Sequence, residues 1–375
     1  MRILVINCGS SSIKYKLFCF PQAKVAAKGL IEGIGEEGSQ IEDHHQGMRI
    51  LFSELHASGV IKRLSDIDAI GHRVVHGGER FRQPHLIDKE VLRKIKDNCR
   101  LAPLHNPANL EGIKAVQGLL PHINQVAVFD TAFHQTIPNY AYLYPLPLKY
   151  YRKYGIRRYG FHGTSHQYVA LEAARQLKKP LAKLRLITCH LGNGCSITAI
   201  DRGKSVDTSM GFTPLEGLMM GTRCGDIDPA AVTYIMKREN LTAPQAESIL
   251  NKKSGLLGVS GISNDMRLIK KAVKEGNLRA KLALDMFIYR IKKYIGAYAF
   301  VLGRPDAVCF TAGIGENNPH IISRLKRDIC RILGSKVRVL VIPTDEELMI
   351  AHLTYKLVSA LKPEGQSSKK EGDKR

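Results

Sequence analysis

A run of small and hydroxyl-bearing residues near the start of the chain has the composition of a phosphate-binding loop. In VINCGSSSIKYKL, residues 5–17, six turn-forming residues lie between two apolar runs, and Lys14 follows closely. Backbone N–H groups that turn inward beside a lysine can hold an anion. The alternation of side chains after the turn indicates a strand, not the helix of a Walker loop. The sequence therefore predicts a hairpin in which Asn7, Ser10 and Ser12 meet phosphate, or else an ordinary turn.

A second hairpin of the same design is expected about 180 residues further along the chain. RLITCHLGNGCSITAI, residues 185–200, again reads as a strand, a small-residue turn and a strand, and DRGK at 201–204 leads to another short run. Two hairpins of one design indicate a duplicated domain, with each copy offering a turn to a shared cleft.

Strands alternate with helices along the chain, which predicts the α/β class. Apolar residues recur every three or four positions through 278–303, so this segment should be one long helix. Asp-Pro at 228–229 and Asn-Pro at 318–319 should begin two others. A glycine turn at 313–317, between a buried strand and a helix start, offers a second nucleotide contact. The segment 345–361 is expected to be the final helix.

Nine further segments of the chain combine histidine, arginine, glycine or acidic residues with apolar flanks. They are GHRVVHGGE (71–79), APLHNPANL (102–110), FDTAFHQTIP (129–138), YGFHGTSHQYV (159–169), CHLGNGCS (189–196), DTSMGFTPLEGLMMGTRCGDIDP (207–229), SGISNDMR (260–267), FTAGIGENN (310–318) and IPTDEE (342–347). In this order and at these spacings they resemble the acetate kinase family, which has the acetate/sugar kinase, actin and heat-shock ATPase superfold. The resemblance covers the chain from residue 1 to about 360.

The resemblance implies a reversible transfer of the γ-phosphoryl group of ATP to acetate, giving acetyl phosphate and ADP. Mg²⁺ would assist, with Mn²⁺ as the alternative metal. A carboxylate with a pKa near ~4–5 is already ionised at neutral pH, so the attack needs no general base. The obstacle is repulsion between two anions, and positive groups should therefore supply most of the catalysis.

Candidate catalytic residues follow from the resemblance. Arg223 and His162 would stabilise the equatorial oxygens of the transferring group, and Asp130 would orient Arg223 or a magnesium-bound water. Arg73 would hold the carboxylate of acetate in a planar fork. The alternative for both arginines is a surface charge at the end of an element, and for Asp130 a turn residue. The implied acyl pocket is apolar and consists of Val75, Leu104, Phe161 and Pro214.

The implied nucleotide contacts come from both hairpins and from two later segments. They are Ser10, Ser12, Lys14, His190, Leu191, Gly192, Asn193, Gly194, Asp265, Met266, Arg267, Gly313, Ile314, Gly315, Glu316 and Asn317. Asn7 and Glu346 would bind the metal, with waters retained. Glu346 is alternatively a first-turn glutamate that stabilises the last helix.

Other histidines occupy family positions with less definite roles. His105, His134, His166 and His190 are among the fourteen histidines of the chain, and several of these should be hydrogen-bonded scaffold. His166 would support His162, and the glycine between these two residues indicates a loop. No zinc site is expected, because no HxxxH or HExxH helix motif accompanies acidic ligands.

The expected architecture is two duplicated actin-like, ribonuclease H-like domains with the nucleotide cleft between them. Residues 1–133 plus 348–361 would form the domain on the acyl side, and residues 134–347 the domain on the nucleotide side. Residues 362–375 would be a disordered basic tail. A homodimer is expected from the family alone.

The composition limits the partners of the protein. The net charge is +22 over 375 residues, but the tail adds only +2 and the rest is spread out. We therefore expect a solvated surface suited to anionic substrates and no nucleic-acid partner. No apolar run approaches the ~20 residues of a membrane span and no signal-peptide pattern is present, which predicts a cytoplasmic protein without a membrane partner. The eight cysteines form no CxxC pair and should be reduced.

Two other functions stay open from the sequence. A propionate or butyrate kinase would use the same residues, because one methylene group changes binding by only ~1–3 kcal/mol. The alternative from another class is an actin-like nucleotide-binding module, or a basic nucleic-acid binder, without transfer activity. Such a module would not need Arg73.

Overall fold

The chain forms two compact units, each built around one sheet. The computed structural model describes residues 1–103 and 105–361. Unit 1 contains Met1–Gly77, Gln83–Phe129 and the chain from Glu347 onward, and unit 2 contains Gly78–Arg82 and Asp130–Glu346. The predicted tail, 362–375, lies outside the described residues. The substrate roles that the sequence assigns to the two domains stay predictions.

The sheet of unit 1 has six strands in the order β3-β2-β1-β4-β6-β5. Their bounds are β1 Arg2–Cys8, β2 Ser12–Cys19, β3 Lys24–Glu32, β4 Ala69–Val74, β5 His85–Leu86 and β6 Asn124–Phe129. The strands β1, β2 and β3 form an antiparallel meander, whereas β4 and β6 run parallel to β1. The predicted hairpin around the serine-rich turn is confirmed.

The sheet of unit 2 repeats this order, as β11-β10-β7-β8-β9. Its strands are β7 Arg185–Leu191, β8 Cys195–Asp201, β9 Lys204–Thr208, β10 Ala307–Thr311 and β11 Arg338–Val341. Three strands again form an antiparallel meander, and two more run parallel to the first of them. At the predicted DRGK turn, Arg202 (φ 51°) and Gly203 (φ 85°) both have positive φ, as a tight two-residue hairpin requires. The shared order confirms the α/β class and the repeat of the hairpin design.

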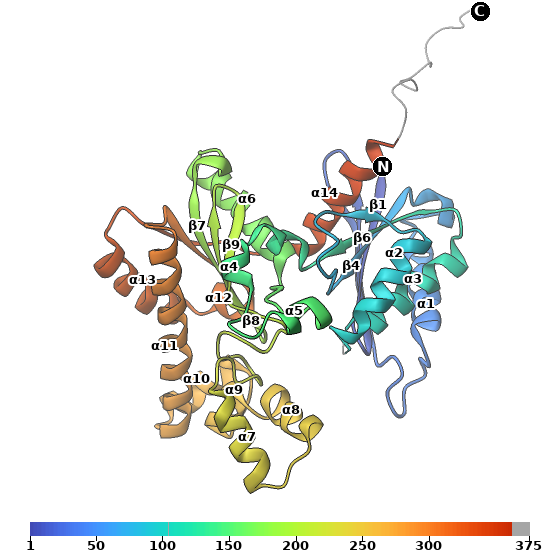
Figure 1. Ribbon diagram of the computed structural model, residues 1–375. Coiled ribbons are helices and arrows are strands. Elements are labelled where there is room, and N and C mark those ends of the chain that lie inside the picture. The colour runs from blue at the N-terminus through green and yellow to red at the C-terminus, as the bar shows by residue number, and fades with distance from the viewer. Residues whose placement is uncertain (104, 362–375) are drawn as a thin grey trace, which may run out of the picture. The chain divides into compact units, whose positions relative to one another are not determined.

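Helices cover both faces of the sheet of unit 1 (Figure 1). The alternation of β1 sends Leu4 and Ile6 into the cluster that contains Leu51, and sends Ile3 and Val5 to the other face, against Ile350. The helical segments of the unit are α1 His44–Ala57, η1 Leu64–Asp66, α2 Lys89–Asp97, η2 Asn98–Arg100, α3 Asn106–Leu119 and α14 Glu346–Ser359, whose first residue is assigned to unit 2.

The helices of unit 2 follow several sequence expectations. Asp228 caps α7, and its side chain accepts a hydrogen bond from the Ala230 N–H. The apolar stripe of α11 is confirmed, because Ile288, Ile291 and Ile295 are buried. The segments are η3 Ala132–Thr136, α4 Asn139–Tyr142, α5 Lys149–Tyr154, α6 Gly163–Leu177, η4 Leu181–Lys183, α7 Pro229–Arg238, α8 Ala243–Lys252, α9 Gly255–Ser260, α10 Met266–Lys274, α11 Leu278–Val301, α12 Ala312–Asn317 and α13 Pro319–Leu333.

Two sequence expectations about local structure are wrong. The stretch from Gly163 to His166 is the first turn of α6 and not a loop, because Gly163 follows a left-handed residue, His162, that starts the helix. Residues 312–317 are the short helix α12 and not a glycine turn. A carboxylate oxygen of Glu316 accepts the Ala312 N–H at 2.7 Å, which closes this helical turn despite two glycines.

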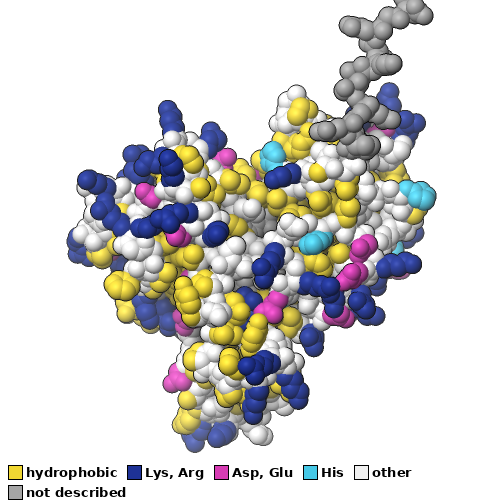
Figure 2. Space-filling view, turned by 45° about the horizontal axis from the view of Figure 1, so that its top comes forward, with side chains coloured by type: hydrophobic (Ala, Val, Ile, Leu, Met, Phe, Trp, Pro, Cys, Tyr) yellow, Lys and Arg dark blue, Asp and Glu magenta, His cyan; other side chains and the backbone are white. Residues whose placement is uncertain are grey.

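The spread of basic side chains and the state of the cysteines agree with what the composition predicted. Figure 2 shows lysine and arginine side chains scattered over the face in view. All eight cysteines are free thiols, as predicted. Within residues 1–103 and 105–361, no helix is both long enough and apolar enough to cross a membrane.

Candidate active site

His162 immediately precedes α6 and lies beside Asp130, the residue that follows β6. It has the left-handed conformation (φ 56°), and the N–H of the next residue, Gly163, donates to the carbonyl oxygen of Asp130 at 2.9 Å. A Cβ at Gly163 would lie 2.1 Å from that oxygen, so only glycine permits this approach. Thr164 donates to the Asp130 carboxylate at 3.3 Å. The start of α6 therefore holds Asp130 and His162 side by side.

The ring of His162 is held by its neighbours on both sides. Its Nδ1 lies 2.9 Å from the hydroxyl of Ser196 on β8. The ring stacks on His190 of β7, with 4.1 Å between centroids and 22° between planes. His190 Nδ1 in turn lies 2.8 Å from the Ser165 hydroxyl. These contacts fix the orientation of a side chain that carries one of the predicted catalytic roles.

Two further histidines of this region are fully buried. Burial lowers the pKa of His134 to about 4, and burial lowers the pKa of His166 well below its usual value. His134 bridges the Ser205 hydroxyl and the Phe161 carbonyl oxygen, at 2.9 and 3.0 Å. Both rings are therefore neutral at pH 7 and act as hydrogen-bonded scaffold, as the sequence indicated for several histidines.

Arg223 is a partly buried cation beside this histidine. A Cβ placed on Gly194, in the β7–β8 turn, would lie 3.5 Å from both His162 Nε2 and Arg223 Nη1. The guanidinium contacts the Pro214 carbonyl oxygen (3.3 Å) and the Met220 sulfur (3.9 Å), and within residues 1–103 and 105–361 it meets no carboxylate. Burial accordingly lowers the pKa of Arg223. A partly desolvated guanidinium without a counter-ion favours an anionic ligand.

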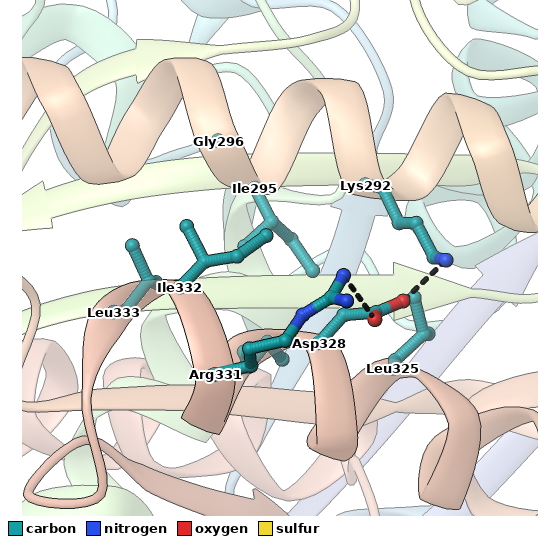
Figure 3. A pocket seen from close by; sticks show the side chains of 9 residues that line it. Lys292, Ile295, Gly296, Leu325, Asp328, Arg331, Ile332 and Leu333 are labelled. Carbon is teal, nitrogen blue, oxygen red and sulfur yellow. Dashed lines mark hydrogen bonds and ion pairs between the residues drawn. The ribbon is translucent and has the colours of Figure 1, made fainter.

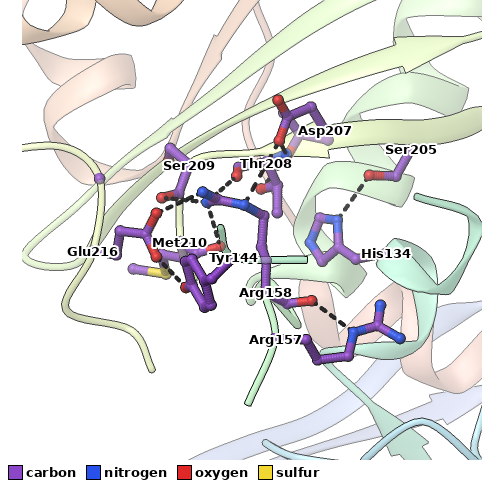
Figure 4. A network of polar contacts seen from close by, with 12 residues as sticks. His134, Tyr144, Arg157, Arg158, Ser205, Asp207, Thr208, Ser209, Met210 and Glu216 are labelled. Carbon is purple, nitrogen blue, oxygen red and sulfur yellow. Dashed lines mark hydrogen bonds and ion pairs between the residues drawn. The ribbon is translucent and has the colours of Figure 1, made fainter. Parts of the chain in front are cut away.

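Arg158 has the opposite surroundings (Figure 4). Its guanidinium donates to the carbonyl oxygens of Thr208, Ser209 and Met210, at 2.7 to 3.2 Å, and to Glu216 at 2.5 Å. Burial alone would lower its pKa, but Glu216 and other nearby acidic groups raise it. The Tyr144 hydroxyl donates to the other oxygen of Glu216. The charge of Arg158 is therefore neutralised within the protein. Its hydrogen bonds hold the segment 208–216, which precedes Arg223, in place.

Hydrogen bonds between Gly217 and Asp226 close the loop that carries Arg223. The Gly217 N–H donates to the Asp226 carboxylate at 2.8 Å, and the Asp226 N–H donates back to the Gly217 carbonyl oxygen at 2.9 Å. The Tyr294 hydroxyl, from α11, donates to the same carboxylate at 2.7 Å. The base of the loop is thus anchored to the long helix, which restricts where Arg223 can point.

Replacing Glu216 with alanine should lower the stability of the protein by about 2–3 kcal/mol, or roughly 5–10 °C in Tm, because Arg158 stays buried without its charged partner. Thermal unfolding measures the effect. The matched control is Glu172→Ala, which removes a pair with Arg175, itself 73% exposed, and should cost less than about 1 kcal/mol. Equal losses in the two variants would contradict the role of Glu216.

A large cavity in unit 2 brings together eight of the predicted nucleotide residues. It has a volume of about 720 Å³ and is lined by Gly192, Asn193, Asn264, Asp265, Met266, Arg267, Gly313, Ile314, Asn317 and Asn318. Asn264 donates to the Asn193 side chain at 3.1 Å. A Cβ at Gly221 would lie 1.9 Å from that same Asn193 oxygen, so the Arg223 loop approaches the cavity rim closely.

Five predicted nucleotide residues of unit 2 do not line this cavity: His190, Leu191, Gly194, Gly315 and Glu316. Three of them have structural contacts instead. Leu191 is fully buried in β7, and Gly315 packs against Leu191 and Phe310. Glu316 bonds the Ala312 N–H and the Thr344 N–H, so its carboxylate supports the backbone. These three residues shape the wall behind the cavity.

In unit 1, the predicted phosphate loop joins β1 to β2. The Gly9 N–H donates to the Ser12 carbonyl oxygen at 2.8 Å, and His44 Nε2 of α1 lies 2.9 Å from the Gly9 carbonyl oxygen. The Lys14 ammonium lies 2.5 Å from Glu347 at the start of α14, and Lys16 lies 3.2 Å from the same carboxylate. Burial would raise the pKa of Glu347, but the two lysines hold it below its usual value.

The predicted acetate residues Arg73 and Val75 lie at the end of β4. Arg73 is the fifth residue of this strand and pairs with Val128 of β6. The Val75 N–H donates to the Asn109 side chain at 3.0 Å, and Asn109 donates to the Cys8 carbonyl oxygen at 2.8 Å. One asparagine of α3 therefore ties together the ends of β1 and β4. Leu104, also predicted for the acyl pocket, lies outside the described residues.

Comparison with known proteins places the chain in a family. The model of the acetokinase family matches residues 2–334. The chain belongs to the acetokinase family. An acetate kinase of Halothermothrix orenii is 53% identical over 398 aligned positions, covering 96% of this chain and all of the relative.

Solved structures agree with the family assignment. The acetate kinase of Porphyromonas gingivalis has a TM-score of 0.89 and 45% identity, and covers 95% of this chain and 99% of its own. A propionate kinase of Francisella tularensis has a TM-score of 0.87 and 42% identity at the same coverage. The family and its fold are thus as the sequence motifs indicated.

Within this acetokinase chain, sequence reasoning missed the residues that hold the candidate groups in place. Ser196 lies in CHLGNGCS and Asn109 in APLHNPANL, so their segments were singled out but their roles were not. Arg158 and Glu216 bond across 58 positions of the chain, a distance at which no local pattern signals a pair. These residues carry no chemistry themselves and are found only through their partners.

The predicted metal ligands are oxygen donors, which suit Mg²⁺. Glu346 is the first residue of α14, where both its proposed roles remain open. In the described part of the chain, no three histidine, cysteine, aspartate or glutamate side chains converge as a metal site. Asn7 and Glu346 stay predictions as metal ligands.

A smaller pocket of about 130 Å³ lies between α11 and α13 (Figure 3). Its walls are mostly apolar, with Ile295 and Ile332 among them. At one side, Asp328 accepts from Arg331 and pairs with Lys292. None of the predicted site residues lines this pocket.

Proposed function

We infer that the protein is an acetate kinase, which transfers the γ-phosphoryl group of ATP to acetate and catalyses the reverse reaction. Membership of the acetokinase family and the acetate kinases among its relatives support this function. The structural observation that carries it is Arg223, a partly buried cation that lacks a carboxylate partner in the described residues and lies beside His162 and the β7–β8 turn.

The reaction requires positioning and positive charge more than proton transfer. A carboxylate oxygen of acetate attacks the γ-phosphorus, and the bond from that phosphorus to the bridging oxygen breaks, so that ADP leaves with the electron pair. Acetate is ionised at neutral pH and loses no proton. Arg223 and His162 would donate hydrogen bonds to the equatorial oxygens, on which negative charge is distributed in the transition state.

The remaining roles are proposed on the resemblance and on position. Arg73 would hold the acetate carboxylate, and the apolar side chains predicted for the acyl pocket would exclude water from it. The 720 Å³ cavity offers room for the adenosine. Mg²⁺ would be bound by Asn7, Glu346 and phosphate oxygens, and would neutralise charge on the phosphates. A homodimer and a cytoplasmic location stay predictions, which molar mass in solution and cell fractionation would test.

A propionate kinase is the second candidate, because a solved propionate kinase is 42% identical to the chain. We expect purified protein with ATP and Mg²⁺ to form acetyl phosphate from acetate, trapped as the hydroxamate. Propionate should react with a kcat/KM within about 10–200-fold of acetate, the range that one methylene group sets. Formate and butyrate are tested as further acceptors in the same assay.

A signal with acetate no larger than without any acid would refute the kinase assignment. A higher kcat/KM for propionate than for acetate would instead favour the second candidate. Omission of Mg²⁺ and replacement by Mn²⁺, in the same assay, test the metal dependence.

A further inference from the structure

A buried chain of hydrogen bonds leads away from the ring of His162. Nδ1 of His162 lies 2.9 Å from the Ser196 hydroxyl, and Nε2 of His166 lies 2.7 Å from that same hydroxyl. The other nitrogen of His166, Nδ1, lies 2.7 Å from the Thr188 hydroxyl. Ser196, His166 and Thr188 are all fully buried, so no water competes for these bonds. They come from β8, α6 and β7, elements that pack together in unit 2.

The number of protons available to these hydrogen bonds limits which group donates in each of them. His166 is neutral, because burial keeps its pKa far below 7, and it therefore carries one N–H. Ser196 has a single hydroxyl proton to share between two ring nitrogens. If His166 donates from Nε2, Ser196 must donate to Nδ1 of His162. If His166 donates from Nδ1 to Thr188, Ser196 donates to His166 and must accept from His162.

Each arrangement has a consequence for the opposite edge of the His162 ring. In the first arrangement His162 is neutral, and its only proton is on Nε2. In the second arrangement Nδ1 carries a proton, and Nε2 carries one as well only when the ring is an imidazolium. Nε2 faces the Gly194 position, from which Arg223 Nη1 is equally distant at 3.5 Å. Of the two arrangements with a neutral ring, only the first gives His162 an N–H at Nε2 that an anion could accept.

We propose that Ser196 is a positioning residue, whose hydroxyl keeps a hydrogen on Nε2 of His162 and directs it to the side where Arg223 lies. This inference rests on the proposed function, in which that N–H meets the transferring phosphoryl group. Because a hydroxyl can donate or accept, Ser196 also remains bonded if anion binding protonates the ring.

The charged and titratable groups around His162 come from four directions. His190 of β7 stacks on its face, and His166 of α6 meets it through Ser196. Arg223 lies near its Nε2 edge, and Asp130, at the end of β6, bonds the first turn of α6. The Ser196 hydroxyl bonds Nδ1 of the ring, so its removal should act on the ring tautomer first.

The test combines histidine ¹⁵N NMR with steady-state kinetics on three variants of the full chain. Ser196→Ala removes the hydroxyl, and Ser196→Thr keeps it. The matched control is Ser205→Ala, which removes an equally buried hydroxyl that bonds His134 at 2.9 Å but does not touch His162. Thermal unfolding of all variants separates loss of fold from loss of positioning.

In the unmodified protein without nucleotide, we expect the hydrogen of neutral His162 on Nε2. Ser196→Ala should give a mixture of tautomers and lower kcat by about 10–100-fold, with the KM values for ATP and acetate changed less than about threefold. It should also shift the pH dependence of kcat. Ser196→Thr should recover most of the rate, and Ser205→Ala should lose little.

A hydrogen on Nδ1 of His162 in the unmodified protein would overturn the proposal, and so would an unchanged kcat in Ser196→Ala. An equal loss in Ser205→Ala would show a merely structural effect and would overturn it too. The NMR result does not depend on phosphoryl transfer. An Nε2–H tautomer in a protein that forms no acetyl phosphate would therefore refute the proposed function while supporting the orientation of the ring.

Discussion

Replacing Arg223 with alanine should lower kcat by about 10³–10⁵-fold, the range for an arginine that stabilises a transferring phosphoryl group. The reason is that the charge on the equatorial oxygens has no substitute cation in the loop between Gly217 and Asp226. The KM for acetate should change much less, because Arg223 acts mainly in the transition state. Initial rates of acetyl phosphate formation at saturating ATP measure both values.

Two further variants serve as controls for the effect of Arg223→Ala on kcat. Arg223→Lys keeps a charge but loses the planar fork, and should recover only part of the rate. Arg175→Ala, an exposed arginine of the same unit that pairs with Glu172, should leave the rate unchanged. If Arg223→Ala loses no more activity than Arg175→Ala, Arg223 has no catalytic role.

Replacing Arg73 with alanine should raise the KM for acetate by about 10–100-fold, because the carboxylate loses charge-assisted hydrogen bonds worth about 1.5–3 kcal/mol. The KM for ATP should stay nearly constant, since Arg73 would contact only the acid. Initial rates over a wide acetate range give both constants. The split between the two substrates separates the role of Arg73 from that of Arg223.

The matched control for Arg73 is Arg63→Ala. Arg63 belongs to the same unit and pairs with Asp66, but its side chain is 79% exposed. Its loss should change neither KM. A normal acetate KM in Arg73→Ala, or an equal rise in Arg63→Ala, would remove Arg73 from the substrate site.

The main elements could be predicted from the sequence because their signals are local. Side-chain alternation on both sides of a small-residue turn indicates a hairpin wherever it occurs, and the three- and four-residue spacing in 278–303 indicates a helix. The start of α6 could not be predicted in this way. It depends on a left-handed His162 and on the approach of Gly163 to Asp130, which involves a segment more than thirty residues earlier.

The candidate site shows the same division between local and distant signals. Motifs identified the residues that would meet substrate, because such residues cluster in short polar segments. They could not show that Glu316 bonds backbone N–H groups, or that Arg158 is neutralised while Arg223 is not. Arg158 follows a basic and aromatic stretch, and Arg223 follows a stretch rich in glycine and methionine. Only the partners of the two arginines in the fold distinguish structural from functional charge.

The central claim is that cationic groups, and no proton acceptor, allow two anions to react. The most direct test is a crystal structure of the protein with ADP, Mg²⁺, acetate and a planar aluminium fluoride that mimics the transferring group. We predict that Arg223 and His162 Nε2 lie within hydrogen-bonding distance of the fluoride atoms, and that Arg73 binds the acetate carboxylate. Guanidinium groups remote from both ligands would contradict the account.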